Sequence, residues 1–427
     1  MSATTVTPST EPAQATRPVP RTWKTAISLA VFALLGLIAF GVLGASKPVT
    51  FTWTGRDTGV TLPETVANSQ TLGVVTGILM LAITAFSVWR TWNRVKTPVW
   101  AIVLFGLLFI TALLASVGAD GTVPVIYLAT GALSFAVPVV FGALAGVLGE
   151  RVGVVNIAIE GQLLMGAFLA AVIGSITGNL FLGIAAAMVA GALVAMVLAA
   201  FSIRYLVDQI IVGVVLNVLV AGITSFFYSA VLTQNSKETN FPGTLPFLPI
   251  PGLSQIPVIG PIFFDHRITT YAMFILVPVV GFILYRTRIG LRLRAVGEHP
   301  LAADTVGINV NRTRFWVMTL SGLLAGLGGA ALTIGSVGPF VRDMSAGQGY
   351  IALACVILGR WNPWYASIAA LLFGFSRIFQ VWAGQSGSAI PADFIEMIPY
   401  VVTLIAVAGF VGKSVGPAAA GKAYVKQ

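Results

Sequence analysis

Long apolar runs recur along almost the whole chain, and they constrain its fold more than any single motif does. A run of about 20 apolar residues can cross the hydrocarbon core of a bilayer as one helix. The candidate helices lie near 25–45, 70–90, 98–117, 124–148, 154–174, 178–203, 207–232, 268–286, 313–334, 346–360, 363–382 and 393–412. The pattern predicts an all-α, polytopic membrane protein with about 10–12 transmembrane helices.

The composition also places the chain in lipid. Hydrophobic residues make up 57% and charged residues 9% of the 427 residues, which is too few charges for an ordinary soluble surface. The single cysteine, Cys355, excludes an internal disulfide, and we expect it to pack as a small side chain. With only His266 and His299 beside it, the sequence has no recognisable metal-ligand cluster.

The run at 346–360 is short for a complete span. The residues Gly359-Arg360-Trp361-Asn362-Pro363 interrupt the apolar pattern directly after it. Irregular backbone at membrane depth is tolerated where it is buried in protein or lines a water-filled cavity. We therefore expect a re-entrant segment or a broken pair of helices here.

Lysine and arginine are distributed unevenly between the two sides that the helices define. With the N-terminus inside, only Lys47, Arg56, Lys237, Arg267 and Arg342 lie clearly outside. The positive-inside rule then predicts a multi-pass protein of the cytoplasmic membrane with both termini cytoplasmic. The excess of positive charge, +10 in total, is explained by cytoplasmic faces that lie next to anionic membrane lipid. The sequence has no basic stripe with interleaved aromatic residues, so nothing suggests a nucleic acid partner.

One carboxylate interrupts the apolar run at 154–174. Glu160 follows Asn156 by four residues, so a helix that starts near 154 would carry both side chains on one face. An acidic side chain within a span usually faces the bundle interior or a polar pathway, and these two residues are predicted to line one. In the alternative interpretation, Glu160 only hydrogen-bonds a neighbouring helix or lies protonated near an interface.

Two loops differ from the others. The outer loop from about 233 to 267 is rich in proline, which predicts an irregular, fairly rigid cap that is either a docking surface or a connector. In the inner loop, Pro300 suits the first turn and Gly307 the C-terminal stop of a helix of about two turns. Small Ala302 and Ala303 would let another surface approach closely. Spacing alone favours a partner-docking helix no more than an amphipathic linker at the lipid interface.

Three motifs, in this order, resemble the permease subunits of ABC importers, and more narrowly the nucleoside permeases of the group that includes ribose and branched-chain amino-acid permeases. They are Gly-Glu-Arg-Val-Gly-Val-Val-Asn-Ile-Ala-Ile-Glu-Gly from Gly149, Asp-Gln-Ile-Ile-Val-Gly from Asp208 with Asn217, and Gly290 to Pro300 continuing through Gly307-Ile308-Asn309-Val310. The resemblance covers roughly residues 122–412.

The resemblance implies roles for particular residues. The segment from Glu298 to Val310 is similar to the coupling helix that seats in a groove of the ATPase subunit, with His299 where the family often has Asn. The implied coupling residues are Glu298, Pro300, Ala302, Ala303, Asp304, Gly307 and Ile308. Asn156 and Glu160 match the motif near the translocation path, and Asp208, Gln209 and Asn217 match the second polar motif.

The resemblance also divides the chain. It implies additional membrane helices at 25–121, the core permease domain at 122–412 and a cytoplasmic tail at 413–427. Residues 1–24 are rich in Thr, Pro, Ala and Ser and have no apolar face, so by composition we expect a disordered cytoplasmic tail there. The sequence Gly412-Lys413-Ser414 lacks the leading glycine of a phosphate-binding loop and follows a membrane helix where a strand is required. The chain is therefore expected to be no enzyme and to bind no cofactor, with ATP used by a partner subunit.

The resemblance predicts a permease that moves a nucleoside, of purine type or a related polar solute, into the cell. Its expected partners are an ABC ATPase, a second and distinct permease, and an extracytoplasmic substrate-binding lipoprotein. A rival interpretation is an ion-coupled secondary transporter in which Glu160 titrates or coordinates an ion. A third is a membrane subunit that transports nothing. The segment from Glu298 to Val310 distinguishes them, because an ion-coupled carrier needs no docking element for an ATPase.

Overall fold

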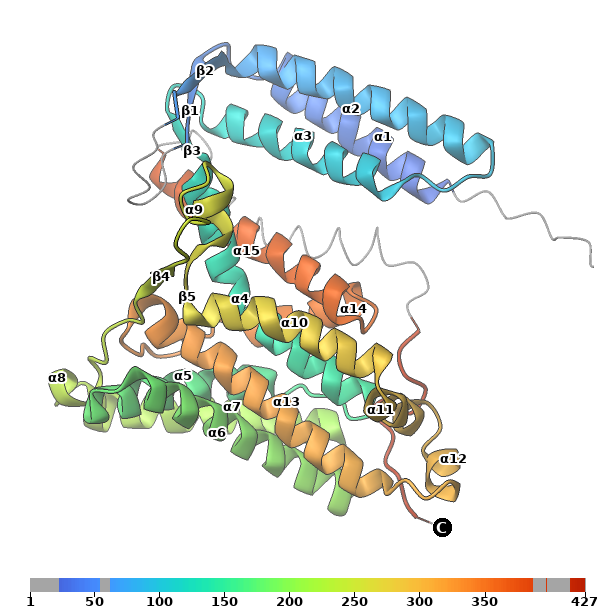
Figure 1. Ribbon diagram of the computed structural model, residues 1–427, viewed down its shortest axis with the longest axis vertical. Coiled ribbons are helices and arrows are strands. Elements are labelled where there is room, and N and C mark those ends of the chain that lie inside the picture. The colour runs from blue at the N-terminus through green and yellow to red at the C-terminus, as the bar shows by residue number, and fades with distance from the viewer. Residues whose placement is uncertain (1–22, 54–61, 387–396, 398–414, 427) are drawn as a thin grey trace, which may run out of the picture. The chain divides into compact units, whose positions relative to one another are not determined.

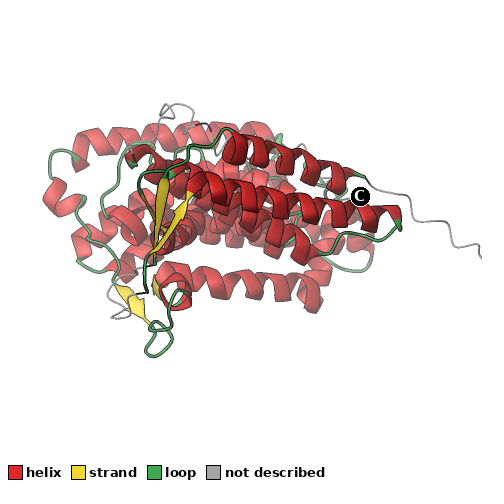
Figure 2. Ribbon diagram, turned by 90° about the horizontal axis from the view of Figure 1, so that it is seen from above, coloured by secondary structure: helices red, strands yellow, loops and turns green. Residues whose placement is uncertain are grey.

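The computed structural model describes residues 23–53, 62–386, 397 and 415–426. Helices form nearly all of its regular structure, with a few short strands between them (Figure 2). Ten of the described helices are long and apolar enough to cross a membrane, which confirms the predicted all-α polytopic class. The predicted helix at 393–412 lies outside the described residues, apart from Met397. The chain forms two compact units, and each is described separately.

The first unit consists of three long helices and a small sheet. Its helices are α1 (Lys24–Gly36), which continues as the π-helical turn η1 (Leu37–Val42), α2 (Ser69–Trp92) and α3 (Val99–Val117). The strands β1 (Pro48–Thr52), β2 (Thr65–Asn68) and β3 (Thr122–Pro124) pair in the order β2-β1-β3. Leu29, Ala33, Met80 and Phe105 form a buried apolar cluster between the helices.

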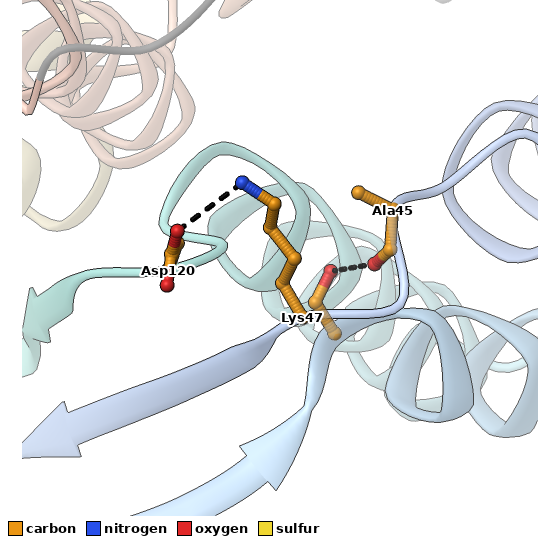
Figure 3. A network of polar contacts seen from close by, with 4 residues as sticks. Ala45, Lys47 and Asp120 are labelled. Atoms are coloured by element: carbon orange, nitrogen blue, oxygen red, sulfur yellow. Dashed lines mark hydrogen bonds and ion pairs between the residues drawn. The ribbon is translucent and has the colours of Figure 1, made fainter.

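Polar contacts close the end of this unit where the strands lie. The Lys47 ammonium donates a hydrogen bond to Asp120 Oδ2 at 3.2 Å, and the Ser69 hydroxyl donates to the Ala45 carbonyl at 3.3 Å (Figure 3). Lys47 and Asp120 are both more than half exposed, so their ion pair contributes about 0–1 kcal/mol. Backbone pairing and helix packing therefore hold this end together.

The second unit consists of Phe51–Thr65 and the chain from Pro124 onward, and it contains the remaining elements. Its long helices are α4 (Val125–Arg151), α5 (Ile159–Thr177), α6 (Leu180–Ala199) with η2 (Ala200–Arg204), α7 (Gln209–Phe227) with η3 (Tyr228–Leu232), α10 (Ile268–Arg286), α13 (Val310–Leu332) with η4 (Thr333–Val337), and α15 (Pro363–Gln385). Its short elements are α8 (Ser236–Thr239), β4 (Phe247–Pro249), α9 (Ile259–Phe263), β5 (Asp265–Arg267), α11 (Arg288–Glu298), α12 (Pro300–Thr305) and α14 (Gln348–Leu358).

Short polar side chains mark the starts of several helices. Asn179, Asp208, Asn309 and Asn362 each accept hydrogen bonds from backbone N–H groups in the first turns of α6, α7, α13 and α15 respectively. Such caps satisfy N–H groups that have no partner within the helix. Where the chain enters each of these helices is therefore set locally.

The helices α4 and α13 are the most buried spans of this unit. Around them, glycines permit close packing. A Cβ on Gly326 would lie 2.1 Å from the Ala187 carbonyl oxygen, so α13 and α6 touch backbone to backbone. A Cβ on Gly142 would lie 2.8 Å from Ala352 Cβ, and one on Gly146 would lie 2.8 Å from Val356 Cγ2. The pair Gly142 and Gly146 therefore seats α14 against α4.

The second unit has two different ends. Figure 1 shows α11, α12 and the C-terminus at one end of the long helices, and α8 with the β4–β5 pair at the other. The β4–β5 pair is antiparallel, with Leu248 opposite His266. Arg286 ends α10 directly before α11, and Arg312 lies in the first turn of α13 soon after α12. Arg151, at the end of α4, bonds the Tyr285 hydroxyl and the Arg360 carbonyl on the same side. This grouping agrees with the pattern on which the predicted orientation rests, while the side of the membrane stays a prediction.

Large apolar side chains are exposed along the outer faces of the long helices. On α7 they include Ile211, Val215 and Val218, each more than half exposed. Exposed apolar stripes of this length suit a hydrocarbon environment or another membrane helix and would not suit water.

Candidate functional site

The backbone between α4 and α5 is irregular although its sequence is apolar. Gly153 adopts a φ of +87°, a conformation that favours glycine, and the chain turns before α5 begins at Ile159. The prediction of a helix that starts near 154 was therefore wrong. Asn156 lies in the turn and not on the helical face of Glu160. Hydropathy could not reveal this, because a buried turn and a buried helix have the same apolar composition.

Two side chains from α7 satisfy the backbone of this turn. Gln209 Oε1 accepts a hydrogen bond from the Val155 N–H at 2.7 Å, and Asn217 Nδ2 donates to the Ile157 carbonyl at 2.9 Å. Asn217 Oδ1 also accepts from the Gly161 N–H at 2.8 Å, in the first turn of α5. An unpaired buried backbone group costs about 1–3 kcal/mol, which explains why polar residues lie within α7.

Asn156 joins three segments of the unit. Its side chain exchanges two hydrogen bonds of 3.0 Å with the amide of Gln162, and its Nδ2 lies 3.1 Å from the Ser321 hydroxyl oxygen on α13. Ser321 in turn donates to the Ala145 carbonyl of α4 at 2.8 Å. Asn156, Gln162 and Ser321 are fully buried, so this network fixes the turn against α4 and α13.

Glu160 holds the start of a half-length helix. Its Oε1 accepts hydrogen bonds from the Ser345 hydroxyl at 2.6 Å and the Gly347 N–H at 2.8 Å, and its Oε2 accepts from the Gly349 N–H at 2.6 Å. These donors precede or begin α14, so the carboxylate lies at the positive end of that helix dipole. The interaction satisfies N–H groups of an 11-residue helix that is too short to cross a membrane.

The predicted pathway residues thus fall into two groups. Asn156, Glu160, Gln209 and Asn217 are buried and come together around the turn and the start of α5. Asp208 is exposed, and its Oδ1 accepts from the Ile210 and Ile211 N–H groups as the cap of α7. Sequence reasoning missed Ser345, Gly347 and Gly349. The signal was present as Ser-Ala-Gly-Gln-Gly directly before a run too short for a span.

The inner loop forms two short consecutive helices, α11 and α12, with only His299 between them, and we call this pair of helices the hairpin. In α11, Thr287 caps the N-terminus by accepting a hydrogen bond from the Gly290 N–H at 3.1 Å. The second helix, α12, has Pro300 in its first turn, and Gly307 follows it with a φ of +88°. The short helix predicted between Pro300 and Gly307 is therefore present.

Only part of this segment is open to a partner. Leu301 and Val306 are 52% and 75% exposed, and Ala302 is exposed between them. Ala303 is 3% exposed and packs into the core of its own unit, so it cannot offer the close approach expected of it. The remaining predicted coupling residues are Glu298 and Gly307, which are exposed, and Pro300, Asp304 and Ile308, which are partly buried.

The hairpin is anchored to the rest of the unit. The Ala419 N–H donates to the Gly297 carbonyl at 2.9 Å, and the Ala418 N–H donates to Glu298 Oε2 at 3.2 Å. Buried Arg314 donates to the Val152 and Lys422 carbonyls, each at 3.0 Å. The C-terminal residues 415–426 therefore connect the hairpin to the turn before α5, a link that sequence reasoning missed.

Comparisons with known proteins show which family and which relatives this chain resembles in sequence. Residues 128–407 match the family described as the branched-chain amino acid transport system, permease component. The guanosine ABC transporter permease protein NupQ of Bacillus subtilis (strain 168) is 38% identical over 69% of this chain and 95% of that protein. The nucleoside ABC transporter permease protein NupC of Lactococcus lactis subsp. cremoris (strain MG1363) is 37% identical over the same shares.

A more distant relative comes from the first of these organisms. The guanosine ABC transporter permease protein NupP of Bacillus subtilis (strain 168) is 26% identical over 64% of this chain and 79% of that protein. No solved structure matches the chain. The family match spans more than half of the chain and includes both the polar turn and the hairpin, and the chain therefore belongs to the family of permease components of the branched-chain amino acid transport system.

Proposed function

We propose that the chain is the transmembrane permease of an ATP-driven ABC importer that moves a nucleoside, of purine type or a related small polar solute, into the cell. The names of NupQ and NupC support this substrate class and energy source. The observation that carries the proposal is the hairpin of α11 and α12. It exposes Leu301, Ala302 and Val306, and a hydrogen bond from the Ala418 N–H to Glu298 holds it to the C-terminal residues. An exposed apolar helix at one end of a membrane unit suits a groove on a partner protein.

The proposed assembly contains further subunits. An ABC ATPase would receive α12 and use ATP, while this chain binds no cofactor itself. The second permease would be a distinct protein, which is supported by the similarity of this chain to two guanosine permeases of one organism, NupQ and NupP. An extracytoplasmic substrate-binding lipoprotein would deliver the solute to the opposite end of the second unit.

In this proposal, the buried polar residues around the turn before α5 lie beside the translocation path. Asn156, Glu160, Gln209 and Asn217 would set the shape of the path by holding the turn before α5 and the start of α14, and Asp208 would fix the start of α7. The ion-coupled alternative is less well supported, because the Glu160 oxygens already accept three hydrogen bonds from the protein.

A charge on the exposed face of α12 tests the docking role. If Leu301 and Val306 enter a groove on the ATPase, Leu301→Glu or Val306→Glu would bury an unpaired carboxylate, which costs several kcal/mol. We expect expression-normalised nucleoside uptake to fall by at least about tenfold. Substrate-stimulated ATP hydrolysis by the purified complex should fall with it.

Ile289→Glu is the matched control, because Ile289 is 61% exposed but belongs to α11. This variant should keep most of the uptake. If all three variants insert in normal amounts and transport at the wild-type rate, α12 is not the docking element.

A further inference from the structure

A cavity of about 190 Å³ lies beside the β4–β5 pair, which Figure 1 shows at the end of the second unit remote from α12. It is bounded by α4, the β4–β5 pair, the first turn of α10 and the end of α13. One water needs only about 10–15 Å³ of such space, so the cavity has room for a polar ring. Its polar lining consists of Ser134, His266, Arg267, Thr269, Thr270 and Ser336. We name it the outer cavity.

Two threonine hydroxyls in the outer cavity make no hydrogen bond to any residue that the structure describes. Thr269 and Thr270 are 3% and 4% exposed, and neither hydroxyl has a hydrogen-bond partner among the described residues. A threonine inside a helix usually donates to the carbonyl four residues earlier, as Thr224 does to Val220 at 2.8 Å. Thr269 and Thr270 begin α10, so no helical carbonyl precedes them at that spacing.

The start of α10 adds further donors to the outer cavity. No side chain caps the N-terminus of this 19-residue helix, so its first N–H groups are open to a ligand. Thr269 Oγ1 would lie 3.2 Å from a Cβ placed on Gly335, which lines the cavity, so this hydroxyl points toward the opposite wall. A cavity-lining hydroxyl that makes no bond to the protein can donate a hydrogen bond to a polar molecule in the cavity and accept one from it.

The charged and titratable groups at the outer cavity are already engaged. Arg267 Nη1 donates to the Ser336 carbonyl at 2.7 Å, and its guanidinium lies 4.9 Å from the centre of the Phe247 ring. The His266 ring bonds the Ile262 carbonyl at 2.7 Å, and burial lowers the pKa of His266, which favours the neutral ring. Beside these groups the lining offers the Thr269, Thr270 and Ser336 hydroxyls and the first backbone N–H groups of α10, a set that suits a polar ligand that both donates and accepts.

We propose that the outer cavity is a subsite for the ribose of an incoming nucleoside. Vicinal ribose hydroxyls both donate and accept hydrogen bonds, as the hydroxyls of Thr269 and Thr270 do, while the N–H groups of α10 donate to the ribose oxygens. The inference rests on the proposed function, in which the substrate is a nucleoside and enters the permease at this end of the second unit.

The test combines removal of protein hydroxyls with removal of ligand hydroxyls. Uptake of guanosine, 2′-deoxyguanosine and 3′-deoxyguanosine is measured in cells that carry the complete transporter, for the wild type, Thr269→Val and Thr270→Val. We expect at least one Val variant to raise the KM for guanosine about five- to tenfold. The KM for one of the deoxy analogues should stay near the wild-type value, so the preference for guanosine shrinks.

Three further variants separate the role of the hydroxyls from effects on folding. Thr269→Ser and Thr270→Ser keep the hydroxyls and should keep the wild-type preference. Thr224→Val removes an equally buried hydroxyl that is bonded within its own helix, and should leave the preference unchanged.

The possible outcomes test the ribose subsite and the proposed function separately. An unchanged preference in both Val variants, or an equal loss for guanosine and both deoxy analogues, overturns the subsite and leaves the proposed function standing. A folded wild-type transporter that imports none of the three nucleosides overturns the proposed function itself, and the ribose subsite with it.

Discussion

Glu160 shows how a single carboxylate can be accommodated inside an apolar unit. Both of its oxygens are engaged, and the donors are two backbone N–H groups and one hydroxyl from residues 345–349. Because these donors have no other acceptor within the short helix α14, the carboxylate and the backbone satisfy each other. The arrangement agrees with the interpretation in which Glu160 bonds a neighbouring segment, and a role on the pathway stays a proposal.

Removing one acceptor from Glu160 should weaken the unit. In Glu160→Gln the amide keeps one acceptor oxygen, and its NH₂ group would face a backbone N–H. We expect the free energy of unfolding in detergent to fall by about 1–3 kcal/mol. Asp208→Asn is the control, because Asp208 Oδ1 alone accepts both capping hydrogen bonds and Asn caps equally well. A Glu160→Gln variant as stable as the wild type would show that the second oxygen is not needed.

The helix α14 depends on its neighbours for its position. With 11 residues it is too short to span a bilayer, and its start is fixed by Glu160 from α5 while its side chains Ala352 and Val356 lie over Gly142 and Gly146 of α4. The broken geometry expected from the short run at 346–360 is thus held by close packing as well as by hydrogen bonds.

The approach of α14 to α5 makes a steric prediction. A Cβ on Gly349 would lie 2.4 Å from the Glu160 backbone nitrogen, so Gly349→Ala must push the two segments apart. We expect a loss of about 3 kcal/mol in the free energy of unfolding, at the upper end of overpacking effects. At Gly222 in α7 nothing lies within 4 Å of the added methyl group, and Gly222→Ala should be neutral or slightly stabilising. Equal stabilities of the two variants would contradict the close approach.

At the scale of the whole molecule, the main feature is that the second unit has two chemically different ends. The hairpin and helix-end arginines lie at one end, and the β4–β5 pair with the outer cavity lies at the other. The proposed direction of transport requires that these ends face opposite sides of the membrane. The positive-inside rule assigns the arginine-rich end to the cytoplasm.

Cysteine labelling can test this orientation directly, because the native Cys355 is buried. Gln255→Cys in the loop before α9 should react with a membrane-impermeant maleimide on whole cells. Ile289→Cys on α11, outside the proposed docking face, should react only after the cells are permeabilised. Both positions are exposed in the structure, so burial cannot explain a difference between them. The reverse pattern would invert the proposed topology.

The sequence alone determined which segments are apolar helices and where several of them begin. Length and hydropathy predict spans because a helix in lipid must satisfy its backbone internally. Pro300 and Gly307 likewise predicted α12, because the φ angles that they favour are properties of single residues. These features depend on neighbours along the chain, so they can be read without a structure.

Only the tertiary structure decided where the polar side chains find partners. Glu160 meets residues more than 180 positions away, and Asn217 satisfies the backbone of a turn that hydropathy reads as helix. Ala303 is small in the sequence, but only packing shows that it faces the core. The outer cavity likewise depends on how β5 leads into α10. Hydropathy and propensity act between neighbours in sequence, whereas hydrogen bonds and packing in these helices join residues that the sequence keeps far apart.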